Sequence, residues 1–238
     1  YHTEGTPQRS KQQNTDHHNP NRPLVNKQHH NINQYRQQKS TSKIRRSNMP
    51  NYPSVIKALT TEYAIENDIK DESNAFEKMT TDLILKNYNL PPDDLDDGNV
   101  DGYLDGGIDG FYIFVNDRYI KNDEDLEPET IQKHPKIELY LIQNKFTKHF
   151  DETPILKLHS TTERLLDEKD ELGGIAEHIK EKANLFHTVW SQLLTKMPDV
   201  SLSLFYVTNA DNKTKYTSVE RLAQTKQKDL QEKYRNSF

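Results

Sequence analysis

The chain of 238 residues has a formal net charge of −5 at neutral pH, and only 32% of its residues are hydrophobic while 29% are charged. This composition is too polar for a chain that is packed throughout and predicts a folded domain joined to a disordered tail. The absence of cysteine excludes disulfides and thiolate metal sites. No apolar run approaches the roughly 20 residues of a membrane span, so we expect a cytoplasmic protein without membrane contact.

Residues 1–48 are the predicted tail, because Gln, Asn, His, Ser, Lys and Arg dominate them without helical or strand periodicity. They hold nine Lys and Arg against two Asp and Glu, whereas residues 49–238 hold 23 against 35. The predicted folded domain, 49–238, is therefore acidic. An acidic domain argues against a broad phosphate-binding surface and limits nucleic-acid contacts to local basic positions, to the tail or to regions beyond this sequence.

Apolar residues recur at spacings of three and four over two stretches after residue 54, which predicts two helices. The shared face of the first consists of Val55, Ile56, Leu59 and Tyr63. The second runs past Phe76 to Ile84. The following segment, 93–110, is rich in Asp and Gly and is predicted to be loop or turn until Phe111, apart from an optional short strand around residues 100–104.

Two strands are predicted next. Residues 111–115, FYIFV, are aromatic and β-branched, which is typical of a strand buried on both faces. After a polar connection, residues 137–145 alternate, so that the apolar side chains of one face lead to Gln143 and Lys145 while Glu138 lies on the other face. This second strand therefore carries polar chemistry at the end of an apolar face.

The rest of the pattern predicts helix, helix, strand and helix. Thr153 is the expected N-cap of the first helix, which Gly173-Gly174 should break. A longer helix over 175–197, a strand over 200–208 and a charged helix over 217–235 follow. With the preceding elements, this order is typical of an α/β sandwich.

The polar groups at the strand ends suit one kind of chemistry. Metal-assisted phosphodiester hydrolysis needs oxygen ligands for a hard cation and a group that activates water or stabilises developing charge. Asp109 lies at the entry to the first strand, and Gln143 and Lys145 project from one face of the second. If the two strands are neighbours, an acid, an amide oxygen and an ammonium group converge at one end of the sheet, beside glycines that permit close approach of a phosphate.

Asp105–Gly110 (DGGIDG), an apolar strand and then Gln143–Lys145 (QNK) resemble the Mrr-type branch of the PD-(D/E)xK nucleases, in which (D/E)xK appears as QxK. More narrowly, Phe76-Glu77 and Phe150–Glu152 resemble the AIPR family of abortive-infection phage-resistance proteins, over about residues 70–210. The resemblance implies a restriction-endonuclease-like α/β/α sandwich with a central mixed sheet. It also implies a Mg²⁺- or Mn²⁺-dependent endonuclease that acts in antiviral defence, with DNA as the expected substrate.

The same resemblance implies roles for four residues. Asp109 is the metal-binding acid, Gln143 replaces the second acidic ligand, and Lys145 is the catalytic lysine. An amide binds Mg²⁺ less strongly than a carboxylate, so Glu77 on the preceding helix is expected to join the site as a ligand and supply negative charge. Proteins of this family are longer, so we expect residues 215–238 to lead into a further region that contributes to nucleic-acid binding; a homodimer is also compatible with the resemblance.

Two other interpretations stay open. A non-catalytic nucleic-acid or protein interaction module could retain the nuclease fold, which the acidic domain and the amide at Gln143 favour. A calcium loop is the other, because five residues match positions 1, 3, 5, 6 and 9 of an EF-hand: Asp97, Asn99, Asp101, Gly102 and Asp105. Ile108 stands where the bidentate glutamate is needed, so a solvated acidic loop is the simpler interpretation of residues 93–101.

Basic residues near the motif could contact phosphate, although solvated surface positions are the simpler interpretation: Lys148, His149, Lys157 and His159. Trp190 lies on the apolar stripe of its helix and is predicted to be a core residue.

Overall fold

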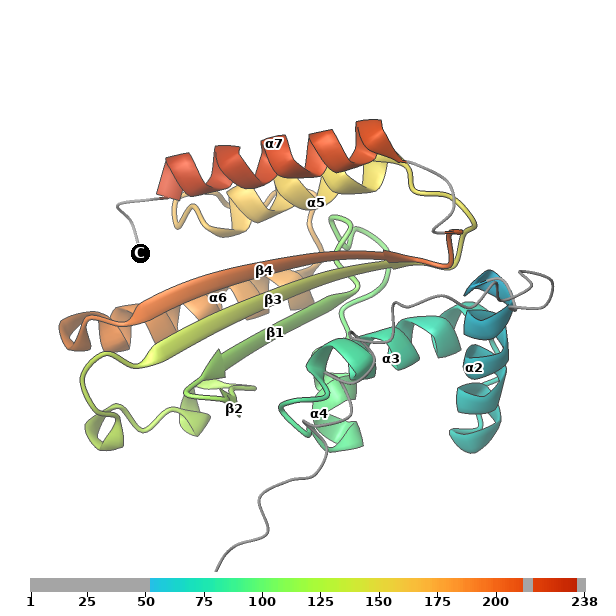
Figure 1. Ribbon diagram of the computed structural model, residues 1–238. Helices are drawn as coiled ribbons and strands as arrows, with labels where there is room; N and C mark the ends of the chain where they lie inside the picture. The colour runs from blue at the N-terminus through green and yellow to red at the C-terminus, as the bar shows by residue number, and fades with distance from the viewer. Residues whose placement is uncertain (1–51, 212–215, 235–238) are drawn as a thin grey trace, which may run out of the picture. The chain divides into compact units, whose positions relative to one another are not determined.

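A four-stranded mixed sheet organises residues 52–211 and 216–234, which are the residues that the computed structural model describes (Figure 1). The strand order is β2-β1-β3-β4. The strands are β1 (Gly110–Val115), β2 (Arg118–Tyr119), β3 (Lys136–Lys145) and β4 (Asp199–Thr208). The chain is thus α/β, as predicted. The predicted tail, residues 1–48, lies outside the described residues.

The register of the sheet decides which residues meet at its ends. β1 runs antiparallel to β3, with Gly110 opposite Ile142, and β4 runs parallel to β3, with Lys145 opposite Thr208. The start of β1 therefore lies at the same end of the sheet as the last residues of β3 and β4. The prediction that residues 111–115 are buried on both faces is confirmed, since every residue of β1 is buried.

Helices cover one face of the sheet through the predicted apolar stripes. Leu158 of α5 (Glu152–Leu165) and Phe186 of α6 (Glu177–Leu193) belong to one core cluster with Ile113 of β1 and Leu139 of β3. The helix α7 (Thr217–Tyr234) lies alongside α5 (Figure 1). Trp190 is partly buried against this cluster, in agreement with its prediction.

The starts and ends of these helices differ from the prediction. The N-cap of α5 is Asp151 rather than Thr153. The helix ends at Leu165, well before the two glycines that were expected to break it. The C-cap residue, Leu166, is buried in the core.

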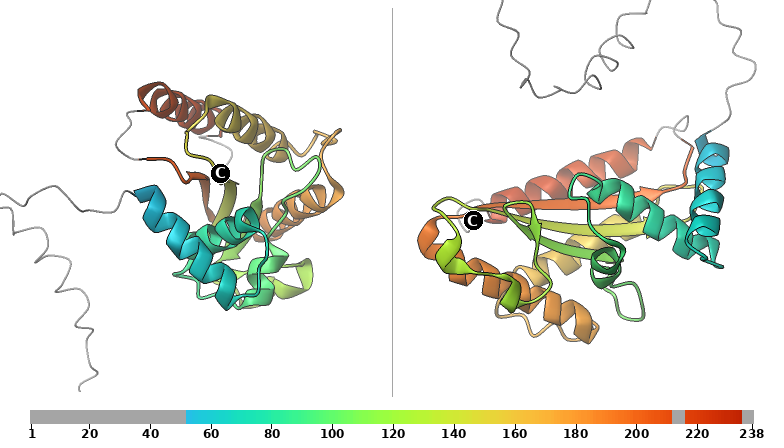
Figure 2. Two further views of the ribbon diagram at one scale, coloured as in Figure 1. Left: turned by 90° about the vertical axis from the view of Figure 1, so that its right-hand side faces the viewer. Right: turned by 90° about the horizontal axis from the view of Figure 1, so that it is seen from below.

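Two further helices contribute to the opposite face. Leu85 of α3 (Glu72–Leu85) and Leu95 of α4 (Pro92–Asp97) pack with Tyr112, Phe114 and Ile142. The left part of Figure 2 looks along the strands and shows the sheet between the α5–α7 pair and the helices α2 to α4. Helices thus cover both faces.

The predictions for the N-terminal half need two corrections. The helix α2 (Tyr52–Glu66) forms as predicted, but half of its predicted apolar face is wrong, because Val55 and Leu59 are exposed while Ile56 and Tyr63 are partly buried. Thr60 is the buried residue, and its Oγ1 lies 4.0 Å from the Met79 sulfur of α3. The predicted loop from residue 93 begins as α4, since proline at the first helical position and acids in the first turn favour a helix. The optional short strand around residues 100–104 does not form.

No helix among the described residues is both long and apolar enough to cross a membrane.

Candidate metal centre

Asp109 is fixed against β3 by the loop that enters β1. Its backbone N–H donates to the Ile142 carbonyl (2.8 Å), and the Asn144 N–H donates to its Oδ2 (2.5 Å). The carboxylate therefore continues the hydrogen-bond ladder between the two strands. Its other oxygen, Oδ1, has no hydrogen-bond partner among the described residues, although Asp109 is only 4% exposed.

Gln143 lies beside the glycine turn that precedes Asp109. Its side chain is buried, and its Nε2 is 3.0 Å from the position that a Cβ on Gly107 would occupy. Its Oε1, like Asp109 Oδ1, is buried without a partner. A buried acceptor without a partner costs free energy. These two oxygens are therefore groups that a bound cation would satisfy.

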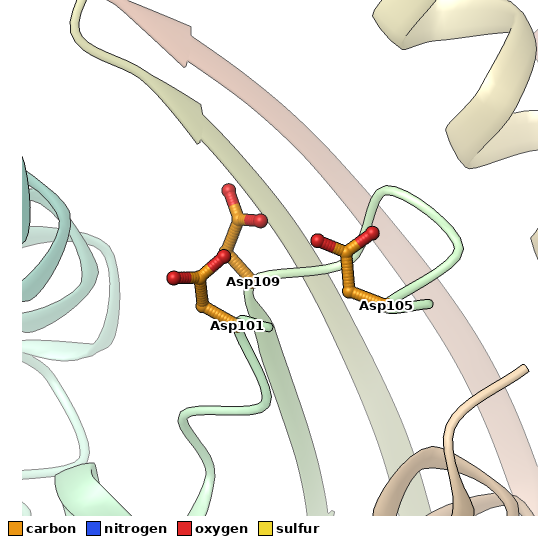
Figure 3. Close-up of side chains that lie close together, drawn as sticks. All are labelled: Asp101, Asp105 and Asp109. Atoms are coloured by element: carbon orange, nitrogen blue, oxygen red, sulfur yellow. The ribbon is translucent and has the colours of Figure 1, made fainter. Parts of the chain in front are cut away.

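Two more carboxylates face the same space. One oxygen from each of Asp101, Asp105 and Asp109 lies within 4.8 Å of the others (Figure 3). Asp105 Oδ1 also accepts from the Gly107 N–H (2.6 Å) and forms an ion pair with Lys157 (3.0 Å). The three acids recur at every fourth position in a glycine-rich loop that turns back on itself, so the loop rather than a regular element brings them together.

Electrostatics shows that this end of the sheet is crowded with negative charge. Burial raises the pKa of Asp109 to about 6; the Asn144 N–H and the charge of Lys145 act in the opposite direction. Burial, followed by the charges of Asp101 and Asp109, raises the pKa of Glu77 to about 7, and Lys145 again opposes the shift. Glu77 and Lys145 thus lie within electrostatic reach of Asp109, and a cation would relieve the crowding.

Asn144 joins α3, the helix that carries Glu77, to the end of β3 through two side-chain hydrogen bonds. Thr80 Oγ1 donates to Asn144 Oδ1 (2.9 Å), and Asn144 Nδ2 donates to Thr81 Oγ1 (3.3 Å). One turn away, the rings of Phe76 and Phe146 are 5.0 Å apart. The sequence pattern missed both threonines, although their position on the buried side of α3, beside Phe76, is a usable signal.

Of the four residues that the sequence singled out, Gln143 lies beside the glycine turn before Asp109, and Glu77 and Lys145 lie within electrostatic reach of Asp109. Glu77 does not belong to the group of carboxylates whose oxygens lie within 4.8 Å of one another, which consists of Asp101, Asp105 and Asp109. Glu138 is excluded, as predicted: it is buried on the other face of β3 and bound to Lys136 at the far end of the strand (2.6 Å). As candidate metal ligands, Asp101 and Asp105 were considered only as parts of a calcium loop, although Asp105 is also the first residue of the DGGIDG motif. That loop does not form, because Asp97 Oδ2 accepts from Lys182 (2.5 Å) and Tyr119 (2.6 Å) instead.

The other basic candidates differ in placement. Lys148 and His149 are exposed, as the simpler interpretation expected, and Lys157 pairs with Asp105. The surface interpretation of His159 is wrong, because its side chain is 6% exposed and packs beneath α7.

Substitution of Gly107 by Ala tests whether the turn holds Gln143 in place. A Cβ at Gly107 would lie 2.9 Å from Lys157 Cδ and 3.0 Å from Gln143 Nε2, at a φ of +83° that disfavours L residues. We expect the free energy of unfolding to fall by about 2–3 kcal/mol. Gly174→Ala is the matched control, since its φ is +78° but nothing lies within 4 Å of the added Cβ.

In denaturant titrations the control should lose only about 1 kcal/mol, the part due to backbone strain. Equal losses at the two positions would show that the contact with Gln143 is not tight.

No protein-family model matches this chain, and no curated protein or solved structure is significantly similar to it. Function is therefore inferred from the site.

Proposed function

We propose that this chain carries a divalent-metal-dependent endonuclease with a restriction-endonuclease-like core, which hydrolyses phosphodiester bonds of DNA within an antiviral defence protein of the AIPR type. One observation carries the proposal: two buried oxygens that have no hydrogen-bond partner within the described part of the chain, Asp109 Oδ1 and Gln143 Oε1, lie at one end of the sheet, and two further carboxylates lie beside Asp109. The order DGGIDG, strand, QNK supports it independently.

The donor set fits Mg²⁺ or Mn²⁺. Every candidate ligand offers oxygen, which hard divalent cations prefer, and the surrounding acids supply the charge that an amide lacks. Asp109 and Gln143 would hold the ion, with Glu77 as the third candidate. Asp101 and Asp105 add negative charge beside them. When bound, the ion supplies Lewis-acid polarisation of the phosphate and a more acidic water.

The residues of the chain itself provide the remaining functions. The Lys145 ammonium group stabilises negative charge that develops on the phosphate oxygens. As an alternative to binding the ion, Glu77, whose pKa is raised to about 7 by burial in the metal-free protein, is suited to accept a proton from the attacking water near neutral pH. The glycines before Asp109 let the turn pack tightly, because a Cβ at Gly106 would lie 2.6 Å from Thr161 Cγ2 and one at Gly107 would lie 3.0 Å from Gln143 Nε2.

Plasmid cleavage tests this function. We expect supercoiled plasmid to be nicked or linearised by the purified 238-residue chain with Mg²⁺ or Mn²⁺, and to stay intact with EDTA. The variants Asp109→Ala and Lys145→Ala should both be inactive. Cleavage that persists unchanged in both variants would reject the site.

A non-catalytic interaction module is the second candidate, and the amide at Gln143 and the acidic composition of residues 49–238 favour it. Calorimetry with MgCl₂ separates the two. Mg²⁺ binding that is lost in Asp109→Ala supports a metal centre, whereas plasmid binding without Mg²⁺ binding or cleavage supports the module.

The change Gln143→Glu tests the amide as a ligand. A carboxylate at this position should bind Mg²⁺ about tenfold more tightly, because it adds formal charge to the donor set. It should also destabilise the metal-free protein, since it adds a buried negative charge beside Asp109. Calorimetry and thermal unfolding measure the two effects.

The matched control is Gln132→Glu, which adds the same charge at an exposed position on the loop before β3. It should change neither property. Unchanged Mg²⁺ affinity in Gln143→Glu would remove Gln143 from the ligand set.

A further inference from the structure

A second site lies away from the acidic cluster, where β4, α5 and α7 line a partly open cavity of about 940 Å³. Cavities of this size are typical of small-molecule sites. Leu202 and Leu204 of β4 form its floor, and Leu158 of α5 and Leu230 of α7 line its sides. None of the residues proposed for the metal centre lines it.

The cavity exists because α7 covers the sheet incompletely. Only two residues of this charged helix, Val219 and Leu230, are buried. On β4, Leu202 and Leu204 remain half-buried, whereas their partners on β3, Leu139 and Leu141, are fully buried. The described residues therefore leave apolar surface on the floor of the cavity exposed to water. A bound molecule would cover this surface, and its removal from water would stabilise the complex.

Among the residues that line the cavity, His159 is the buried polar one. Its side chain is 6% exposed and lines the cavity, and its Nε2 has no hydrogen-bond partner among residues 52–211 and 216–234. Nδ1 lies 3.4 Å from a carboxylate oxygen of Glu163, whose other oxygen accepts from Lys233 (3.1 Å). Burial lowers the pKa of His159, which favours the neutral ring. With the N–H on Nδ1, facing Glu163, Nε2 is a buried acceptor that needs a donor.

We propose that this cavity binds a small neutral molecule with a largely apolar body and one N–H or O–H group that donates to His159 Nε2. The apolar lining disfavours charged ligands, because their desolvation would not be compensated. Lys226, the lysine at the cavity, is paired with Asp229 (2.9 Å). The site is independent of the proposed nuclease function.

Fluorescence titration with N-phenyl-1-naphthylamine tests the proposal, because this neutral dye has an apolar body and one N–H donor. The whole 238-residue chain should bind it saturably, at one molecule per chain. Its N-methyl derivative, which lacks the donor, should bind about fivefold more weakly, as expected for loss of one neutral hydrogen bond.

Two variants locate the dye. Leu202→Trp fills the cavity from its floor and should abolish saturable binding, while Leu83→Trp, on the exposed surface of α3, should leave it unchanged. His159→Phe keeps a ring but removes the acceptor, so the dye and its N-methyl derivative should then bind equally. Circular dichroism checks that each variant is folded.

Three results would overturn the proposal: no saturable binding to the unmodified chain, full binding to folded Leu202→Trp, or a preference for the N–H dye that survives in His159→Phe. If Leu202→Trp does not fold, the comparison of the two dyes on His159→Phe decides alone.

Discussion

Replacing Asp109 with Asn is expected to stabilise the metal-free protein and to abolish its stabilisation by Mg²⁺. The carboxylate is buried, one of its oxygens has no partner, and it shares its surroundings with Asp101 and Asp105. Asn keeps an oxygen that can accept from the Asn144 N–H, but it removes the buried charge. The free energy of unfolding of the metal-free protein should therefore rise while its affinity for Mg²⁺ falls. Such opposite changes are expected where a functional residue lowers the stability of the fold.

The pH dependence of this effect follows from the pKa of Asp109. Its value of about 6 in the folded protein lies above the ordinary 3.8, so the folded state holds the proton more tightly. Below about pH 4 the carboxyl is protonated in the folded and the unfolded state, and its full contribution to the free energy of unfolding is present. This contribution is lost as the pH rises through about 6, where the folded state loses the proton as well. Asp109→Asn should thus gain on the order of 3 kcal/mol over the parent protein at about pH 7.5 and almost nothing at about pH 4.

Urea unfolding of both proteins across this pH range, with EDTA and with Mg²⁺, measures these differences. Asp82→Asn on the exposed side of α3 is the control and should show neither the gain nor the loss. A gain that is independent of pH, or Mg²⁺ stabilisation that persists in Asp109→Asn, would contradict the assignment.

The sequence predicts the strands of the site well, because side chains along a strand alternate between the two faces of the sheet and the buried positions can be recognised from this alternation. The alternation in residues 137–145 separates Glu138 from Gln143, and the aromatic and β-branched run at 111–115 marks the strand buried on both faces. Once these strands pair antiparallel, the entry to one and the end of the other must meet. The proximity of Asp109 to the QNK segment therefore follows from the pattern together with this pairing, which the pattern alone leaves open.

The loop before β1 could not be predicted in the same way. Its path depends on left-handed backbone at Gly106 and Gly107, which composition permits but does not specify. Hence the convergence of Asp101 and Asp105 on Asp109 emerges only in three dimensions. The exposed Val55 and Leu59 show a different limit of the sequence. Apolar spacing predicts that a helix has an apolar face, but it does not predict which other element covers that face.

Replacing Lys145 with Met should abolish cleavage while Mg²⁺ binding persists. Met is close in length and apolar, so the change removes the charge with little loss of volume. Loss of a group that stabilises developing charge costs about 10²- to 10³-fold in rate. Lys145 also lowers the pKa values of Asp109 and Glu77. Without it both carboxyls hold their protons to higher pH, so any residual activity should have its pH optimum shifted upward.

Rates of plasmid cleavage between about pH 6 and pH 9, with calorimetry for Mg²⁺, separate this role from a structural one. Lys133→Met, on the loop that enters β3 at the opposite end of the strand, is the matched control and should keep both rate and pH profile. A lysine with a structural role alone would reduce stability and leave the cleavage rate of the folded variant near that of the parent protein. The shift of the pH optimum tests separately whether the Lys145 charge acts on the two carboxyls that the reaction uses.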